Sequence, residues 1–133
     1  MLASFINWHL RLGFCRLYLY FDDPGDDGIA EARRLRREAT ERGLFADCIT
    51  IVPVDDGVRA EWSGMTTAER WDLPKVWHHV EVRQLLNAEH ALRRAHAAGD
   101  IEWLLHIDSD ELFHVDVRCL PARSAHGSSR LTS

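Results

Sequence analysis

Residues 16–23 read RLYLYFDD, a run of apolar and aromatic side chains that ends in two carboxylates. Such a run is typical of a β-strand that is buried on both faces, as the strands of parallel sheets are. The following turn, residues 22–28, contains four aspartates, and Asp26 or Asp27 is placed to cap a helix over residues 29–42. This stretch therefore predicts a strand that leads from the interior to an acidic loop.

The flanking sequence continues an alternation of helices and strands. Apolar residues recur at helical spacing before Gly13 and again before Gly99, and two further apolar runs read as strands. The predicted elements are a helix over 2–12, strands over 16–21 and 48–52, a helix over 79–98 and a strand over 101–107. This order predicts an α/β domain with a parallel sheet. Residues 55–78 show little periodicity and are expected to be irregular. In the last predicted strand, Trp103 is expected to lie in the core.

Composition excludes several classes of protein. The chain has 133 residues, enough for one domain, and its 46% hydrophobic and 28% charged residues are ordinary for a globular protein. The net charge of −5 argues against a nucleic-acid partner. No apolar run approaches about 18 residues, so we expect no membrane span, and the N-terminus lacks the pattern of a signal peptide. The three cysteines form no C-x-x-C pair, which argues against a disulfide framework or a thiolate zinc site.

Two acid clusters follow predicted strands. Asp22 and Asp23 end the first, and Asp108 and Asp110 end the third. Because the carboxyl ends of parallel strands share one edge of a sheet, we expect both clusters at the same edge, where ligands of α/β folds bind. With 12 aspartates in the chain, chance alone supplies about one D-x-D pair, so its position after an apolar strand is the informative feature. Carboxylates in such a place suit a hard cation such as Mg²⁺ or Mn²⁺ bound together with phosphates.

These segments resemble a known family. Residues 104–113, LLHIDSDELF, resemble the metal-binding D-x-D segment of GT-A glycosyltransferases, most closely the group that includes families 2 and 92. Residues 5–14, FINWHLRLGF, and the set Arg83, Gln84 and Asn87 also match that group. The resemblance implies a three-layer α/β fold with a mostly parallel sheet, of the nucleotide-diphospho-sugar transferase type. It also implies transfer of a sugar from a nucleotide diphosphate sugar donor to an acceptor, which is a glycan, a lipid or a protein.

The resemblance also implies roles for individual residues. Asp22 and Asp23 would contact the base and ribose of the nucleotide, with Asp23 the better candidate. Asp110 would ligate Mn²⁺ or Mg²⁺ directly, and Asp108 would contact the ribose or support the metal. The remaining candidates are Arg83, which would neutralise a phosphate or hold Asp108, and Glu111 and Asn87, which would lie close to the site.

The chain departs from the family pattern at both ends. The strand that precedes the first helix in that fold is absent, which would leave backbone groups at a strand edge unpaired. An acceptor-binding half is also absent, and no residue can be assigned as the catalytic base. We therefore expect residues 1–115 to form a partial GT-A-like unit and residues 116–133 to be a disordered tail. Without a signal or anchor the expected location is cytoplasmic, or membrane- or Golgi-associated if the chain belongs to a longer parent.

Two other functions stay open at this stage. His106, Asp108, Asp110 and His114 form an H-x-D-x-D-x-x-x-H string, which is compatible with a metal-dependent hydrolase. The chain is alternatively a non-catalytic remnant that binds a nucleotide sugar. Aromatic residues of the irregular segment are candidates to stack on a sugar or base, namely Trp62, Trp71 and Trp77.

Overall fold

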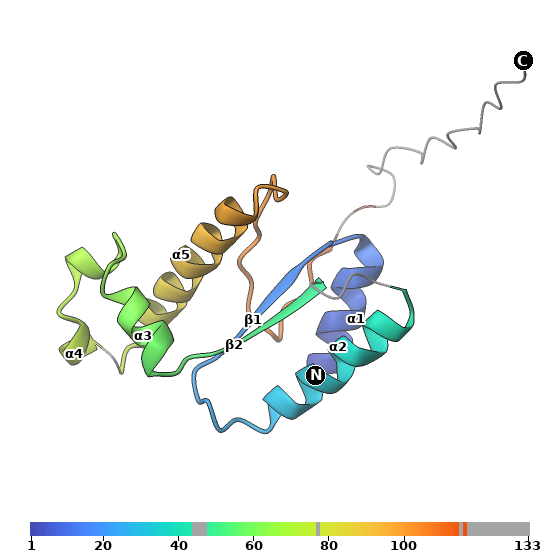
Figure 1. Ribbon diagram of the computed structural model, residues 1–133, viewed down its shortest axis with the longest axis horizontal. Coiled ribbons are helices and arrows are strands. Elements are labelled where there is room, and N and C mark those ends of the chain that lie inside the picture. Colours follow the sequence, from blue (N-terminus) through green and yellow to red (C-terminus); the bar gives the residue numbers. More distant parts are fainter. Residues whose placement is uncertain (44–47, 77, 115, 117–133) are drawn as a thin grey trace, which may run out of the picture.

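Two parallel strands lie between the helices in the computed structural model of the chain (Figure 1). The structure describes residues 1–43, 48–76, 78–114 and 116. Strand β1 (Leu17–Phe21) pairs with β2 (Ile49–Pro53) in parallel register. The helices are α1 (Leu2–Leu12), α2 (Gly28–Glu41), α3 (Asp56–Trp62), the short 3-10 helix η2 (Ala68–Arg70), α4 (Leu73–Val76) and α5 (Val80–Ala98). The described chain is thus a mixed α/β structure with a two-stranded parallel sheet.

Helices α1, α2 and α5 and both strands begin and end within one residue of the positions predicted from the sequence. Both predicted helix-ending glycines adopt the left-handed conformation, with φ of 99° at Gly13 and 74° at Gly99. A side chain is disfavoured at such φ values, so glycine is the natural residue at these two ends. None of the helices in the described residues combines the length and the apolar character that a bilayer crossing requires.

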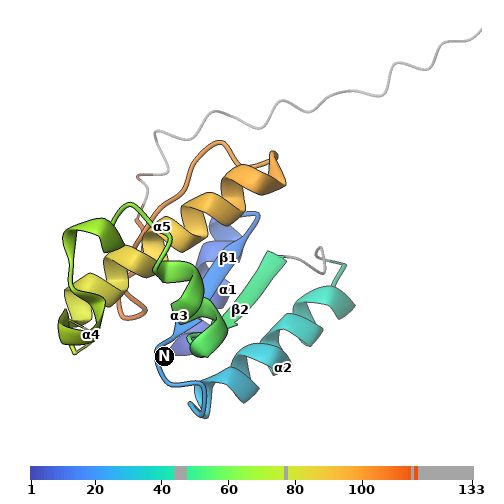
Figure 2. The same ribbon diagram turned by 60° about the vertical axis from the view of Figure 1, so that its left-hand side comes forward.

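Side chains alternate along β1 and enter two separate cores. Leu17 and Leu19 are buried with residues of α1 and α2, whereas Tyr20 packs on the opposite side. The first core contains Phe5, Ile6, Leu17, Leu19, Ala32, Leu35, Ala39, Cys48 and Ile49. The second core contains Val54, Trp62, Met65, Ala68, Val82 and Leu86. Figures 1 and 2 show the corresponding arrangement, with α1 and α2 on one side of the strands and α3 and α5 on the other.

The prediction of an irregular segment over 55–78 was wrong. Most of its described residues form α3, η2 and α4, and Trp62 is completely buried in the second core. The side chain of Asp55 accepts a hydrogen bond from the N–H of Val58 at 3.0 Å and caps α3. These helices are too short for an amphipathic repeat to be visible in the sequence. Burial also removes Trp62 as a candidate for stacking on a ligand.

The third predicted strand, residues 101–107, does not form. These residues have no regular secondary structure, with a bend at Glu102, and pair with neither strand of the described sheet. Trp103, predicted to be in the core, is 89% exposed. A β-strand is defined by hydrogen bonds to a neighbour, so an apolar sequence without a paired neighbour cannot become one. Apart from Asp116, the predicted disordered tail over 116–133 lies outside the described residues.

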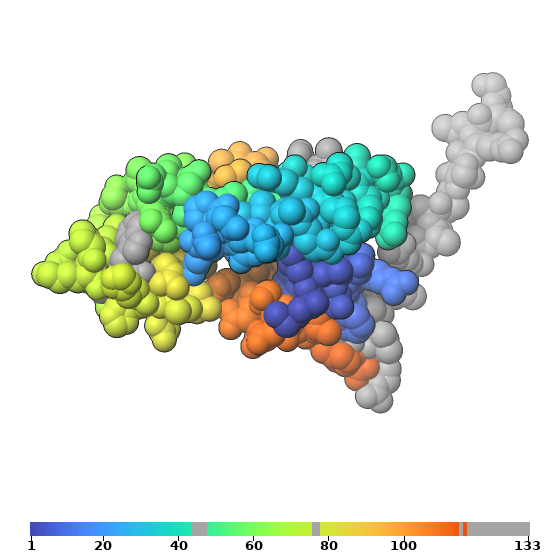
Figure 3. Space-filling view, turned by 90° about the horizontal axis from the view of Figure 1, so that it is seen from below, coloured from blue at the N-terminus to red at the C-terminus, as the bar shows by residue number. Residues whose placement is uncertain are grey.

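Residues 101–107 nevertheless run in the same direction as β1. Arg16, just before β1, forms a two-pronged ion pair with Asp100 at 3.2 Å. At the far end, Ile107 packs against the first core. Figure 3 shows the described chain after α5, in orange, lying against the blue residues of α1.

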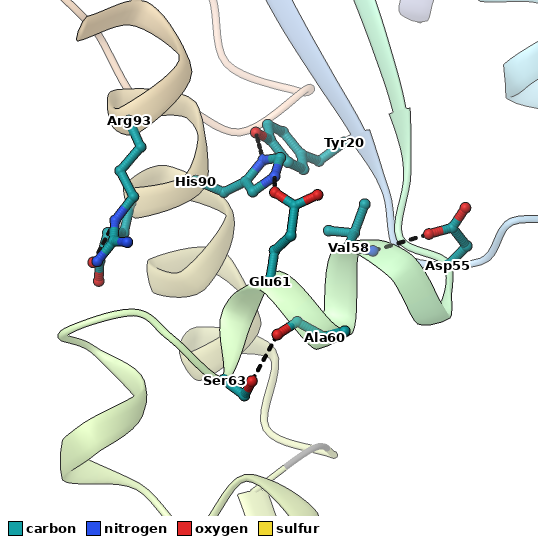
Figure 4. A network of polar contacts seen from close by, with 9 residues as sticks. Tyr20, Asp55, Val58, Ala60, Glu61, Ser63, His90 and Arg93 are labelled. Carbon is teal, nitrogen blue, oxygen red and sulfur yellow. Dashed lines mark hydrogen bonds and ion pairs between the residues drawn. The ribbon is translucent and has the colours of Figure 1, made fainter. Parts of the chain in front are cut away.

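A buried histidine connects β1, α3 and α5 (Figure 4). His90 is 2% exposed; its Nδ1 lies 2.6 Å from the hydroxyl of Tyr20 and its Nε2 lies 2.9 Å from Oε2 of Glu61. A carboxylate only accepts hydrogen bonds, so Nε2 of His90 donates to Glu61, which leaves Nδ1 to accept the O–H of Tyr20. Burial raises the pKa of Tyr20, which keeps its hydroxyl a donor.

We expect His90→Leu to lower the free energy of unfolding by about 1–3 kcal/mol, because it leaves the half-buried Tyr20 hydroxyl without an acceptor. The double variant Tyr20→Phe/His90→Leu removes both partners and should recover much of that loss. Urea denaturation of the two variants measures the difference. Equal losses in the single and double variants would contradict the hydrogen-bonded arrangement.

Glu89 of α5 holds the loop after α3. Its two carboxylate oxygens accept the N–H groups of Thr66 and Thr67 at 2.9 and 2.8 Å, and Arg93 donates to it at 2.7 Å. Burial opposes the charge of Glu89, but the N–H of Thr67, then that of Thr66, and Arg93 together lower its pKa to about 2. A carboxyl whose pKa is lower in the folded than in the unfolded protein stabilises the fold at pH values above its unfolded-state pKa. For Glu89 this contribution is lost as the pH falls toward 2.

Glu89→Gln should therefore lower the free energy of unfolding by about 2 kcal/mol at pH 7, where the wild-type side chain is charged. The difference from wild type should shrink steadily between about pH 4.5 and pH 2, because protonation removes the same charge from the wild type. Denaturation curves across this pH range test the prediction, with the exposed Glu81→Gln on the same helix as the control. A difference that does not change with pH would refute it.

Candidate functional site

Neighbouring residues of α5 each hold one aspartate, one from each acid cluster. The Nε of Arg83 donates to Oδ2 of Asp22 at 2.8 Å, and Nε2 of Gln84 donates to Oδ1 of Asp108 at 3.0 Å. Asp22 lies just beyond the end of β1, and Asp108 lies just beyond residues 101–107. The expectation that both clusters lie at one edge of the sheet is not confirmed, because residues 101–107 are not a strand of the sheet. Successive residues of α5 instead hold one aspartate of each cluster.

Aspartates shape the turn between β1 and α2. Oδ1 of Asp23 accepts the N–H of Gly25 at 2.8 Å, and Oδ1 of Asp26 accepts the N–H of Gly28 at 2.6 Å. Asp26 therefore caps the start of α2, although Asp27 is the residue that directly precedes the helix. The two bonds are typical Asx turns, which orient short loops. Asp23 is exposed and keeps its second carboxylate oxygen available to solvent.

The D-x-D residues lie in a turn of their own. The N–H of Glu111 donates to the carbonyl of Asp108 at 3.0 Å, so residues 108–111 form a closed turn that brings Glu111 back toward Asp108. Asp110 is exposed and makes no hydrogen bond or ion pair with the described part of the chain. Its carboxylate is thus the one in this turn that is most accessible to a ligand.

Helix α1 anchors the chain just after this turn. The backbone of Phe113 donates from its N–H to Nε2 of His9 at 3.2 Å and accepts from Nε1 of Trp8 at 2.7 Å. Nδ1 of His9 lies 2.8 Å from the carbonyl of Phe5, so this nitrogen carries the proton and Nε2 is free to accept. The rings of Phe14 and Phe113 pack edge to face with centroids 5.6 Å apart. The resemblance covered residues 5–14 and 104–113, and the structure shows that the two stretches touch.

The donor set around the turn fits a hard cation only in part. Asp108 and Asp110 are two carboxylates, and one oxygen of Asp108 is already held by Gln84. Mg²⁺ is commonly bound by one or two carboxylates, with water and substrate phosphates completing its shell, so the pair suits a cation that arrives with a phosphate ligand. Across residues 1–43, 48–76, 78–114 and 116, no three His, Cys, Asp or Glu side chains gather to hold an ion. His106 and His114 therefore do not assemble a metal centre with the two aspartates.

The electrostatics of the two turns favour a cationic ligand. Asp22, Asp23, Asp108, Asp110 and Glu111 all lie there, and Asp22 is the one with an ion pair within the described residues. The Arg83 side chain is 21% exposed and the Asp22 side chain 44%, so the pair lies at the rim of the site. Excess negative charge at a surface raises the local concentration of cations.

Asn87 lies one helical turn beyond Arg83 and Gln84 on α5. It is 8% exposed, and its Oδ1 has no hydrogen-bond donor among the described residues. Buried side-chain acceptors are normally paired, so this carbonyl oxygen is an unfilled position for a donor. The role of Asn87 beside the site stays a prediction.

Sequence reasoning did not identify Gln84 as a site residue. It was noted as part of the family-like pattern beside Arg83, and that adjacency was the available signal. Among the remaining stacking candidates, Trp71 directly follows η2 and is 44% exposed. Trp77 lies outside the described residues. Within the described residues, no hydrogen bond, ion pair or ring contact connects Trp71 to the two acidic turns.

Comparisons with protein-family models, with curated proteins and with solved structures find no match to this chain. The function must therefore be argued from the residues and their geometry. The relevant geometry is the pair of bonds by which Arg83 holds Asp22 and Gln84 holds Asp108.

The unpaired carbonyl leads to a stability prediction. Asn87→Leu is similar in shape and removes a buried acceptor that has no donor, so the free energy of unfolding should rise by about 1–3 kcal/mol. Urea denaturation measures this change, and the exposed Asn7→Leu on α1 is the matched control. A lower stability for Asn87→Leu would show that its oxygen has a donor in the folded chain.

Proposed function

We propose that this chain is the nucleotide-sugar-binding part of a GT-A-type glycosyltransferase with a three-layer α/β fold, here in partial form. The observation that carries the proposal is that successive residues of α5 hold one aspartate from the turn after β1 and one from the turn after residues 101–107. In α/β folds, ligands bind beyond the carboxyl ends of the strands, which is where Asp22 lies. The sequence resemblance over residues 5–14 and 104–113 supports the same assignment.

The chemistry of the side chains fits a nucleoside diphosphate. Ribose hydroxyls and base N–H groups are donors, and the carboxylates of Asp22 and Asp23 are acceptors. Arg83 is the cation next to Asp22, so it is placed to offset part of the charge of a diphosphate. The unpaired carbonyl oxygen of Asn87 accepts a further donor from the ligand.

Asp108 and Asp110 would hold Mn²⁺ or Mg²⁺ through carboxylate oxygens. When bound, the cation neutralises the diphosphate and stabilises it as a leaving group. Gln84 holds one oxygen of Asp108, which orients the other oxygen, and Glu111 keeps the turn closed. Phe113, fastened to α1, limits the movement of this turn.

Binding without turnover is the second candidate, because no described residue is placed as a catalytic base for an acceptor. The two candidates share the donor site and differ in whether a sugar leaves the nucleotide. Release of free nucleotide from nucleotide sugars, measured with and without added acceptors, separates them.

We expect UDP to bind in the presence of Mn²⁺ and to bind at least about tenfold more weakly in excess chelator, because two sets of like charges would then face each other. Asp110→Asn should cause a similar loss. Asp72→Asn, which changes an exposed carboxylate on the side of α4, should leave the affinity unchanged. Isothermal titration calorimetry gives these constants. Binding that is insensitive to both the metal and Asp110 would overturn the proposal.

A further inference from the structure

Two consecutive side chains of α1 hold both backbone groups of Phe113. The N–H of Phe113 donates to Nε2 of His9 at 3.2 Å, and its carbonyl accepts from Nε1 of Trp8 at 2.7 Å. Among the described residues, these are the hydrogen bonds that hold residues 112–114. They join the start of the chain to the segment just after the D-x-D turn, where the two lie against each other in Figure 3.

These contacts fit one neutral form of His9. Its Nδ1 lies 2.8 Å from the carbonyl oxygen of Phe5, which only accepts, so Nδ1 carries the proton. Its Nε2 faces an N–H and must offer its lone pair. The side chain is buried, and the rings of Phe5 and Phe14 pack on it with centroids 4.3 and 5.3 Å away. The orientation of the ring is thus fixed by packing as well as by hydrogen bonds.

A second proton on His9 removes its bond to Phe113. Both nitrogens of a protonated imidazole are donors, so Nε2–H would face the N–H of Phe113. Two donors cannot bond to each other. The bond from Trp8 involves no group that titrates near neutral pH, so acid weakens one of the two bonds and leaves the other.

In the described chain, no charged side chain contacts the His9 ring. The contacts of the ring are with Phe5, Phe14 and Phe113. The charged or titratable residues of the adjoining segments make no hydrogen bond, ion pair or ring contact with it. These residues are Arg11, Cys15, Arg16, His106, Asp108, Asp110, Glu111 and His114. A second positive charge on the ring is therefore stabilised only when the ring leaves this position and reaches water.

We propose that His9 is a positioning residue that holds the D-x-D turn while its ring is neutral and loosens the turn when the ring takes up a proton. This regulation rests on the proposed function, because it affects ligand binding only if Asp108 and Asp110 hold a cation. Phe113 comes two residues after the turn over 108–111, so its bonds fix where the turn ends.

The size of the effect follows from proton linkage. A histidine exposed to water has a pKa of about 6.5, so the loosened form takes up protons between about pH 7.5 and pH 5.5. If the closed form excludes that proton, the ratio of closed to loosened chains should fall about tenfold across this range.

The test follows amide hydrogen exchange of Phe113 by NMR in the full chain without ligand. Rates at pH 7.5 and pH 5.5 are corrected for the direct effect of pH on exchange. We expect the protection of this amide to fall about tenfold in the wild type. His9→Gln offers a side-chain oxygen that accepts at either pH, so its protection should stay constant. His96→Gln, which changes an exposed histidine of α5, should behave like the wild type.

Two further comparisons assign the proton. Trp8→Phe removes the bond that does not titrate, so protection should be lower at both pH values and still fall about tenfold between them. His106→Gln and His114→Gln should also keep the fall, and they decide the question if His9→Gln does not fold. Protection that is constant in the wild type, that falls equally in His9→Gln, or that becomes constant in His106→Gln or His114→Gln would overturn the inference.

A binding measurement separates this inference from the proposed function. Calorimetry gives the affinity for UDP with Mn²⁺ in the wild type and in His9→Gln at both pH values. The wild type should lose up to about tenfold more affinity toward pH 5.5, because the comparison cancels the titration of UDP and of the aspartates. Equal losses would overturn the regulation. If neither chain binds UDP at pH 7.5, the proposed function fails, and the exchange of the Phe113 amide alone decides the role of His9.

Discussion

The structure depends on the burial of β1 from both sides. Leu17 and Leu19 enter one core and Tyr20 faces the other, so five residues hold together helices that do not otherwise share a core. Apolar burial is the main source of folding free energy, and a strand buried on both faces contributes to both cores. The strand must also end sharply, because its next residues are charged and cannot follow it inside.

The acidic site follows from that constraint. Asp22 comes immediately after the buried strand, and it is held there by Arg83 from α5. The same helix holds Asp108 through Gln84, so the packing of α5 against the second core sets the relation between the two acidic turns. The site is therefore built by a helix bridging two loops. It does not require the third strand that the sequence suggested.

The success of sequence reasoning varied with the kind of signal. Helices α1, α2 and α5 were predicted to within one residue, because apolar residues recur at helical spacing and glycine or a capping residue stands at their ends. The segment over 55–78 was missed because helices of seven residues or fewer carry too little periodicity. Trp62 is the clear example, since a tryptophan in an aperiodic segment looks like a surface residue but fills the second core.

The prediction of a strand over residues 101–107 was wrong for a different reason. Their apolar sequence has the composition of a buried strand, but composition shows only that a segment is able to form a strand. Strand formation requires hydrogen bonds from a neighbouring backbone, and whether a neighbour is present is decided by the packing of the whole chain. Trp103 is exposed for that reason, although its immediate sequence is as apolar as that of β1.

The sequence by itself determined the local elements, the parallel pairing of its two strands and the position of acids at the strand ends. These features depend on periodicity, on capping residues and on the abrupt change from apolar to charged side chains, all of which are visible within a few residues. Only the tertiary structure decided that Gln84 holds Asp108, that His9 bonds to Phe113 and that β1 pairs with β2 alone within the described residues. Each of these joins residues that are distant in the chain or depends on which neighbour a strand acquires, and one-dimensional patterns carry neither kind of information.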